Sequence, residues 1–455
     1  MNDRDNLRDC VVLGGGMTGL AAGISSGAPV FEAESSPGGI CSSYYVRPNT
    51  NQRLKDPPQD GESYRFEIGG GHWIFGGDGI VSRFIRSRVS TKTYKRRSSV
   101  FFPDKNLYVP YPLQNHLSYL PERIRINALV EMLTGPKGNS ETLSQYLTQN
   151  FGETLGDLFF RPFHELYTAG LWASIAPQDS YKSPVNPALA IHGSTATTPS
   201  VGYNASFIYP ELGLGALAMG MAKECDIHYE KRVVKVDTSA REVVFDDGST
   251  VAYGSLISTL PLNKMLAIAE VTIDQAADPY TSVLVVNLGA IRGQRCPLDH
   301  WIYLPKTQAG FHRVGFYDNV DESFLPRPFR GSGDRVSIYV ERAYPGGQRP
   351  SETEIRAYLD ALVHELQAWE FIKQTEVIDP TWIDVAYTWS WPRSIWREEA
   401  LKRLEEKEIF MVGRYGRWKF QGIAESIRDG LLMGAASRTH REQVKTQLHA
   451  LAATR

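Results

Sequence analysis

Residues 10–19 read Cys-Val-Val-Leu-Gly-Gly-Gly-Met-Thr-Gly, and this stretch decides the fold. The apolar residues 10–13 predict a short strand, and the apolar segment 20–24, directly after the glycines, predicts a helix. A second short strand is expected at 29–31, which read Pro-Val-Phe. The order strand, glycine turn, helix, strand is that of the βαβ unit that opens a dinucleotide-binding fold.

Each part of the glycine turn has its own expected role. Gly14 makes the tight turn, Gly16 lets the backbone approach a pyrophosphate, and Gly19 lets the helix pack closely on the strand. Met17 and Thr18 open the helix, whose free N–H groups and positive dipole end would face the phosphates. We therefore expect these five residues to bind a dinucleotide cofactor.

Glu32 supplies the acid that such a unit uses. It ends the second predicted strand, and 32 − 14 places it 18 residues after the first glycine, against a usual spacing of about 20. A carboxylate there can accept hydrogen bonds from both ribose hydroxyls. Glu34 lies past the strand end, so Glu32 is preferred, and a glycine turn that holds no ligand becomes the weaker interpretation.

Composition disfavours several other classes of protein. The 455 residues predict about three domains at about 150 residues each. With 49 Lys and Arg against 51 Asp and Glu, the net charge of −2 disfavours a nucleic-acid binder with a broad basic surface. The sequence contains no apolar run of about 18 residues, so we predict no membrane-spanning helix. Four scattered cysteines without a CxxC pair predict no metal site, and the polar first residues predict a cytoplasmic protein.

Three consecutive glycines, residues 69–71, interrupt the strand-like segment 64–77. Such a run implies that the backbone passes close to a bulky group. We therefore expect Gly70 and Gly71 against the cofactor and His72 beside it. His72 is also a candidate for acid–base chemistry, and the alternative is a buried histidine that bonds to the backbone.

The middle of the chain is predicted to be mainly helical. Helices are expected at 80–88, 120–134, 140–150 and 153–172. Residues 183–215 are rich in Pro, Gly, Ser and Thr and are predicted to be a connector.

The later part of the chain is predicted to be mainly strands. Residues 226–252 alternate apolar and polar, as in an antiparallel meander, and a further buried strand follows at 255–261. Ser351 and Glu354 have the spacing of a capping box, which predicts a helix over 352–372. A last strand leads to Gly413, and a last helix begins near Ile423.

Residues 30–39 read Val-Phe-Glu-Ala-Glu-Ser-Ser-Pro-Gly-Gly and resemble the glutathione-reductase-type flavoproteins. The resemblance implies that the dinucleotide is FAD, with Ala33, Gly38 and Gly39 along its path and Val234 in the later part of the same domain. It implies an α/β fold in which a glutathione-reductase-type Rossmann FAD-binding domain carries a helical insertion and an antiparallel-sheet substrate domain. The expected boundaries are 1–80, 215–262 and 405–440 for the discontinuous FAD domain, 81–182 for the helical domain, and 183–214 with 263–404 for the substrate domain.

Six separated segments carry a more specific pattern. They are the glycine fingerprint with 37–39, residues 70–75, residues 109–115, residues 151–153 with 159–163, residues 311–313, and residues 413–414. Together they resemble the UDP-galactopyranose mutase branch of the FAD-dependent oxidoreductase and amine-oxidase superfamily.

This resemblance implies a reaction. In such mutases reduced flavin attacks the anomeric carbon of a sugar nucleotide, and no net redox change occurs. The chemistry needs cations near the leaving diphosphate, which arginines and tyrosines supply in the family. Arg313 matches one catalytic arginine, Tyr344 matches one tyrosine, and Arg414 matches the arginine near the flavin. Phe160 and Phe163 belong to the fourth segment and are expected at the substrate.

Two positions depart from the family pattern. Where the second catalytic arginine is expected the chain has Lys182, which can act as a point charge but cannot make the bidentate fork of arginine. Where the second diphosphate tyrosine is expected it has Phe420, which has no hydroxyl. Either the diphosphate is held differently, or the substrate is not a nucleoside-diphosphate sugar.

The predicted site combines these assignments. His72 and Arg313 are the catalytic candidates, and Gly422 and Ile423 join Gly413 and Arg414 as a second helix start beside the cofactor. The main hypothesis is a mutase-like enzyme acting on a sugar nucleotide or related glycosyl compound. The alternatives are an oxidase or dehydrogenase that takes a hydride from an amine or alcohol carbon, and a flavin-binding scaffold without catalysis. A nicotinamide reductant, NAD(P)H, would have to share the flavin-facing cleft, because no second glycine fingerprint is present.

Overall fold

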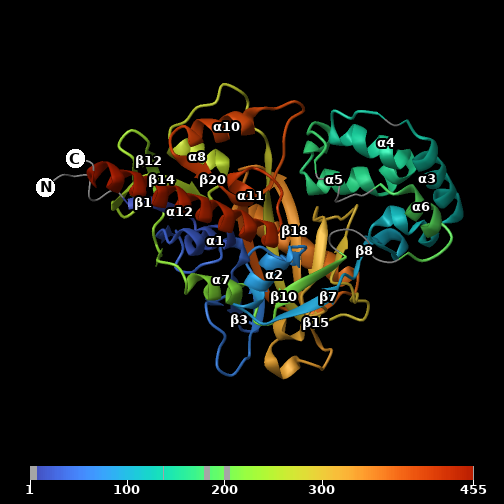
Figure 1. Ribbon diagram of the computed structural model, residues 1–455. Helices are drawn as coiled ribbons and strands as arrows, with labels where there is room; N and C mark the ends of the chain where they lie inside the picture. Colours follow the sequence, from blue (N-terminus) through green and yellow to red (C-terminus); the bar gives the residue numbers. More distant parts are fainter. Residues whose placement is uncertain (1–7, 137, 179–184, 199–204, 454–455) are drawn as a thin grey trace.

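The glycine-rich start of the chain folds as β1 (Arg8–Leu13), α1 (Met17–Ser26) and β2 (Val30–Phe31). The structure is a computed structural model, and it describes residues 8–136, 138–178, 185–198 and 205–453. Figure 1 shows α1 beside the long last helix, α12 (Ile423–Ala453), which covers it along one face of the first sheet.

The first sheet joins segments that lie far apart in the sequence. Its strand order is β11-β2-β1-β14-β13-β12, with β20 beside β14. The strands β11, β2, β1, β14 and β20 run parallel, and β12 and β13 continue as an antiparallel extension. The bounds are β11 (Ile227–His228), β12 (Val233–Asp237), β13 (Glu242–Phe245), β14 (Thr250–Ser258) and β20 (Ile409–Met411).

The predicted meander is only partly correct. Ile227 and His228 do not belong to it, because they pair in parallel with β2. The strand expected at 255–261 is not separate either: residues 250–258 form one strand, which turns from β13 to lie parallel to β1. Alternating polarity does not distinguish an antiparallel partner from a parallel one, so the sequence did not separate these pairings.

The second large sheet has seven described strands. Its order is β19-β15-β18-β17-β16-β8-β9, antiparallel throughout except between β16 and β8. The bounds are β8 (Ser98–Phe102), β9 (Leu107–Pro110), β15 (Tyr280–Arg292), β16 (Trp301–Tyr303), β17 (Arg313–Phe316), β18 (Arg335–Pro345) and β19 (Ile372–Thr388). The helix α9 (Glu352–Ala368) packs on it and begins at the predicted capping box, ending four residues earlier than expected.

The helical part lies on one side of this sheet (Figure 1). It contains α3 (Glu122–Thr134), α4 (Leu143–Leu155), α5 (Arg161–Tyr167) and α6 (Pro187–Gly193). The single helix predicted over 153–172 is wrong, because a π-helical turn at Gly156–Phe160 precedes α5, which ends at Tyr167. The connector predicted at 183–215 also contains α6, which the Asn186 side chain caps by accepting a hydrogen bond from the Leu189 amide.

Two small sheets and several helices complete the described fold. The small sheets have the orders β6-β10-β7 and β4-β3-β5. Their strands are β3 (Ser43–Val46), β4 (Arg53–Leu54), β5 (Tyr64–Glu67), β6 (Ile74–Phe75), β7 (Thr91–Lys95) and β10 (Ser206–Pro210). The other helices are α2 (Gly79–Arg86), α7 (Leu214–Ala222), α8 (Leu262–Ile268), α10 (Trp396–Glu405) and α11 (Gly413–Gly416).

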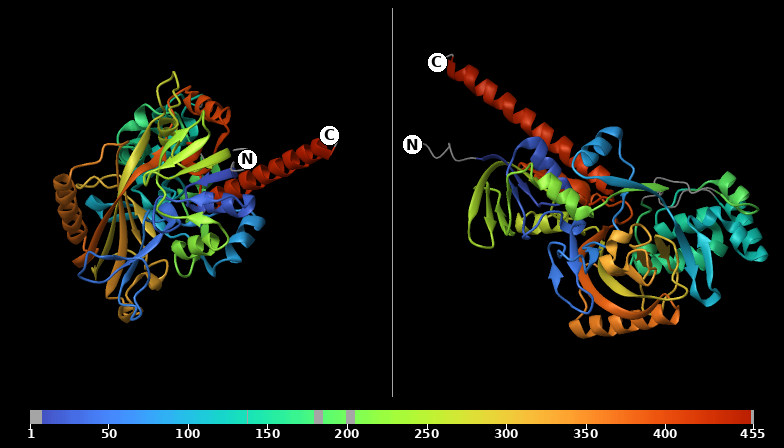
Figure 2. Two further views of the ribbon diagram at one scale, coloured as in Figure 1. Left: turned by 90° about the vertical axis from the view of Figure 1, so that its left-hand side faces the viewer. Right: turned by 90° about the horizontal axis from the view of Figure 1, so that it is seen from below.

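The end of α12 extends beyond the rest of the molecule, as Figure 2 shows. Within the described residues, no helix has both the length and the apolar character that a membrane crossing requires.

Tyr339 on β18 joins the second sheet to the triple-glycine segment. Its ring is fully buried and fills the space that side chains at Gly71 and Gly315 would occupy. A Cβ on Gly315 would lie 1.9 Å from the Tyr339 Cζ, and one on Gly71 would lie 2.0 Å from the Tyr339 hydroxyl oxygen. The two glycines are therefore required by packing.

We predict that Gly315→Ala destabilises the protein by about 1–3 kcal/mol, because the added methyl group overpacks a buried ring. The free energy of unfolding from urea titration measures this loss. Gly79→Ala is the matched control, since its Cβ would meet nothing within 4 Å at the first residue of α2. Equal stability of the two variants would contradict the packing account.

Candidate active site

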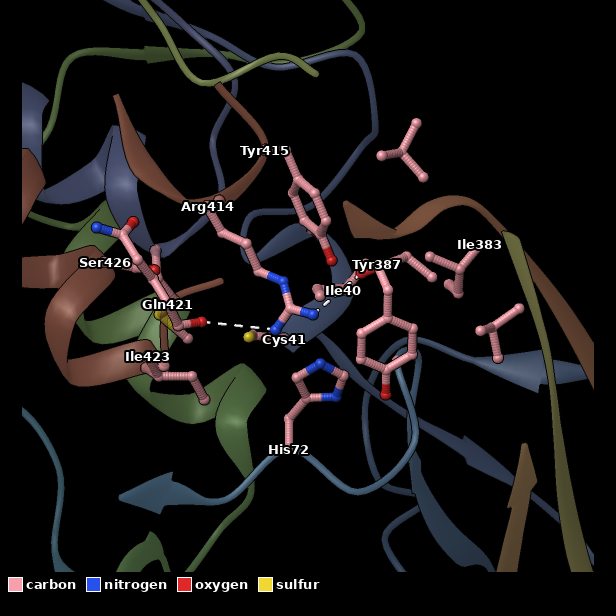
Figure 3. Close-up of a pocket in the computed structure, with 18 of the residues that line it drawn as sticks. Ile40, Cys41, His72, Ile383, Tyr387, Arg414, Tyr415, Gln421, Ile423 and Ser426 are labelled. Carbon is pink, nitrogen blue, oxygen red and sulfur yellow. Dashed lines mark hydrogen bonds between the residues drawn. The ribbon is translucent and has the colours of Figure 1, made fainter. Parts of the chain in front are cut away.

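A cavity of about 510 Å³ lies between the two large sheets. One wall consists of glycine-rich backbone around α1 and residues 38–41, and the opposite wall comes from β15 and β19. Side chains of His72, Arg313 and Arg414 reach it from three separate segments. Figure 3 shows Arg414 and Tyr415 directed into the same space as His72 and Tyr387.

The glycine turn has the geometry that the sequence predicts. Gly14 has a φ of 96°, in the region that favours glycine. A Cβ on Gly19 would lie 1.8 Å from the Gly14 carbonyl oxygen, so helix and turn are in direct contact. At Gly16 the nearest atom to a Cβ is the Gly38 carbonyl oxygen, 4.0 Å away. The backbone therefore leaves space at Gly16 toward the cavity, where a phosphate group can approach.

Glu32 is buried and bonded to the glycine turn itself. Its Oε2 accepts a hydrogen bond from the Gly15 amide at 2.6 Å, and its Oε1 accepts one from the Glu34 amide at 2.8 Å. Burial raises the pKa of Glu32, and these backbone hydrogen bonds partly oppose the rise. The carboxylate thus holds the turn in place, next to where a ribose would lie.

The cavity brings together many of the predicted cofactor residues. Those in its wall are Gly16, Met17, Thr18, Gly38, Gly39, Gly71, His72, Gly413, Arg414, Gly422 and Ile423. The remaining predicted positions lie outside the wall: Gly14, Gly19, Glu32, Ala33, Gly70 and Val234. Val234 is 48% exposed on β12, at the far antiparallel edge of the first sheet, so its side chain does not reach the cavity.

Arg414 is a second cation of the cavity wall, beside Arg313. It follows β20, and its Nη2 donates a hydrogen bond of 3.0 Å to the Ala386 carbonyl oxygen. Its guanidinium lies 4.6 Å from the Phe420 ring centroid and 5.3 Å from that of Tyr387.

Burial, and then the charge of Arg414, lower the pKa of His72 to about 4. His72 is therefore neutral at pH 7, and its ring can donate one hydrogen bond and accept another.

A second charged cluster lies deeper in the cavity wall. Arg313 on β17 and Glu341 on β18 are direct cross-strand partners and form an ion pair through Nη2 and Oε1. The Tyr387 hydroxyl accepts a hydrogen bond of 3.3 Å from Arg313 Nη2 and lies 3.4 Å from Glu341 Oε2. Burial would raise the pKa of Glu341, but Arg313 and His312 lower it to about 2. The carboxylate therefore stays ionised at neutral pH.

The predicted substrate residues do not all meet at the cavity. Arg313 and Phe420 line it. Phe160 and Phe163 are buried in the helical part, although Phe163 packs edge-on against the cavity residue Tyr303 at 5.5 Å. Tyr344 packs against Trp382 at 5.6 Å and is not in the cavity wall. Lys182 lies outside the described residues.

Sequence reasoning missed Glu341. Glu341 gains its role from its register opposite Arg313, which no single-strand pattern reveals. A carboxylate directly after the apolar run 338–340 was the available signal.

The cavity suits a flavin dinucleotide better than a metal ion. Its long glycine-lined wall has the space at Gly16 that a pyrophosphate needs, and α1 presents its N-terminus there. Burial raises the pKa of Cys41 in this wall to about 12, so its thiol stays protonated. In the part of the chain that the structure describes, no group of three or more His, Cys, Asp or Glu side chains could hold a metal.

The parallel sheet, the glycine turn and the cavity beside them define a flavin-dependent enzyme. Residues 29–291 match the family model of the flavin-containing amine oxidoreductases, and the chain belongs to this family. The predicted superfamily and α/β fold class are thereby confirmed.

Solved structures share the whole fold. Reduced UDP-galactopyranose mutase is 21% identical over 94% of each chain, with a TM-score of 0.79. A putative protoporphyrinogen oxidase from Exiguobacterium sp. is 13% identical over 95% of this chain and 99% of its own, with a TM-score of 0.68. Putrescine oxidase bound to putrescine is 15% identical over 94% and 98%, with a TM-score of 0.54.

We predict that Glu341→Gln costs about 3–5 kcal/mol at pH 7, because it leaves the buried Arg313 without its counter-charge. Since the pKa of Glu341 is below that of an unfolded Glu, this stabilisation is complete above about pH 4.5 and is lost as the pH falls toward about 2. Urea titration at several pH values measures both effects.

Asp60→Asn is the control for this substitution, since it neutralises one partner of the exposed Arg47–Asp60 pair and should leave the unfolding midpoint unchanged. A Glu341→Gln variant as stable as the wild type at pH 7 would show that the pair does not hold the cavity wall.

Proposed function

We propose that the protein is an FAD-dependent enzyme that acts on a sugar nucleotide or a related glycosyl compound, with reduced flavin as the nucleophile. The observation that carries this proposal is Arg313, a guanidinium in the wall of the same cavity as the glycine turn and Arg414. The likeness in fold to reduced UDP-galactopyranose mutase supports it. Bound flavin would supply either a nucleophile or a hydride acceptor.

Different residues of the chain would then bind the cofactor and assist the reaction. The amides at the start of α1, with Gly16, would hold the pyrophosphate of FAD. Arg313 would stabilise charge that develops on a leaving group, and Tyr387 would orient the same guanidinium through its hydroxyl. Neutral His72 would donate a hydrogen bond from one ring nitrogen and accept one at the other, beside the reacting atoms.

A second candidate function is an oxidase or dehydrogenase that takes a hydride from an amine or alcohol carbon. The Arg313–Glu341 ion pair favours it, because a guanidinium already paired with a carboxylate attracts a diphosphate less strongly than a free one. Phe420 favours it as well, since it offers no hydroxyl where the mutase pattern has a tyrosine. The two candidates differ in net redox change, which makes them separable by product mass.

We predict that the reduced protein, with oxygen excluded, converts at least one nucleoside-diphosphate sugar of a panel into an isobaric product with a new retention time. Arg313→Lys keeps the positive charge but cannot donate the paired hydrogen bonds of a guanidinium. We expect it to lower kcat/KM by about 10- to 100-fold. Arg335→Lys is the matched control, because Arg335 pairs with Glu376 in the same sheet outside the cavity. Chromatography with mass detection measures each rate.

No conversion under these conditions, together with a product two hydrogens lighter when the flavin is oxidised in air, would contradict the mutase proposal and establish the oxidase.

We further predict that Phe420→Tyr lowers the Kd for uridine diphosphate by about 3- to 10-fold if the substrate is a nucleoside-diphosphate sugar, since the new hydroxyl adds one hydrogen bond at the cavity wall. Calorimetric titration of wild type and variant measures the change. An unaltered Kd would argue against a diphosphate at this position.

A further inference from the structure

The two longest strands, β15 and β19, lose their regular register beside the cavity. Thr281 pairs with Tyr387, and Val283 pairs with Ile383, so the single residue between them on β15 lies opposite residues 384–386 of β19. Such a bulge bends a strand and redirects its side chains, and bulges recur next to active sites. The three bulged residues all lie in the cavity wall.

Ser282 is the residue that faces this bulge. It is fully buried and is not part of the cavity wall. Its hydroxyl donates a hydrogen bond of 2.5 Å to the Asp384 carbonyl oxygen and accepts one of 3.1 Å from the Gly347 amide. One side chain therefore ties the bulge of β19 to the turn that follows β18.

The bulge and the residue that follows it contact the two arginines Arg313 and Arg414. The carbonyl oxygen of Ala386 accepts the 3.0 Å hydrogen bond from Arg414 Nη2. Tyr387, directly after the bulge, presents its ring to Arg414 and its hydroxyl to Arg313.

We propose that Ser282 is a positioning residue: it clamps the 384–386 bulge and thereby fixes Arg414, and through Tyr387 also Arg313, from outside the cavity. The proposal rests on the proposed binding of FAD in this cavity. The Ser282 hydroxyl holds the Asp384 carbonyl, and thereby determines the position of the Ala386 carbonyl two residues further on.

Loss of this clamp has a measurable electrostatic consequence. A cation beside a flavin favours the reduced form, which carries more negative charge than the oxidised form. If the Ala386 carbonyl moves, Arg414 loses an acceptor and its charge is held less firmly toward the glycine-rich wall. The midpoint potential of the flavin should then fall.

The test compares two identical substitutions in the holoprotein, Ser282→Ala and Ser337→Ala. Ser337 is also fully buried, on the neighbouring strand β18, and its hydroxyl has no hydrogen-bond partner among the described residues. We expect Ser282→Ala to lower the flavin midpoint potential, in the direction of Arg414→Gln but by less, and Ser337→Ala to leave it unchanged. Spectroelectrochemical titration measures the potential, and thermal unfolding measures stability separately.

Two further variants distinguish positioning from a general loss of stability. Ser282→Thr keeps the hydroxyl and should retain the wild-type potential, whereas Ser282→Ala in an Arg414→Gln background should shift the potential less than it does in the wild type. If Ser282→Ala gives no folded holoprotein, Ser282→Cys, whose S–H is a weak donor, replaces it with the same expected direction.

An unchanged potential in the Ser282 variant, or an equal shift in Ser337→Ala, would overturn the proposal. Failure of the proposed function would be detected by other measurements, namely the flavin spectrum of the wild type and its activity on sugars. A wild-type protein without a flavin spectrum would contradict FAD binding before any variant is made, and a flavoprotein inactive on every sugar would leave the potential measurement intact.

Discussion

The carbonyl oxygen of Gly14 occupies the place where any side chain at residue 19 would begin, and the rest of the molecule depends on this contact. Because α1 can lie this close to the turn after β1, its N-terminus points along the sheet toward the cavity instead of away from it. The buried Glu32 carboxylate fixes the turn by accepting the Gly15 amide. A short piece of backbone thereby becomes one wall of the site.

The opposite wall of the cavity is formed by side chains of a sheet and not by a backbone turn. It comes from an antiparallel sheet whose core is apolar, and charge enters it only in compensated form. Arg313 and Glu341 neutralise each other across two strands. Arg414 reaches the cavity from the first sheet, and backbone carbonyls and three aromatic rings hold it. The wall thus places a cation next to apolar surface together with its counter-charge.

The sequence predicted the first wall well and the second wall poorly, for a physical reason. The interactions of Gly14, Gly16 and Gly19 are local, so their spacing alone specifies the turn and the start of α1. Glu341 and Ser282 act through partners on other strands, and the sequence of one strand does not determine which residue of the next strand lies opposite. Tyr344 and Val234 were assigned by resemblance, and both lie outside the cavity wall.

The measurement that tests this account most directly is the flavin content of Gly16→Ala beside that of the wild type. Apart from its chain neighbours, the nearest atom to a methyl group at residue 16 would be the Gly38 carbonyl oxygen at 4.0 Å, so the variant should fold as the wild type does. That methyl group would occupy the space that a pyrophosphate needs. The account predicts that the wild type releases about one FAD per chain on acid denaturation and that Gly16→Ala, equally stable, releases little or none. A Gly16→Ala variant with full FAD, or a wild-type protein with none, would contradict it.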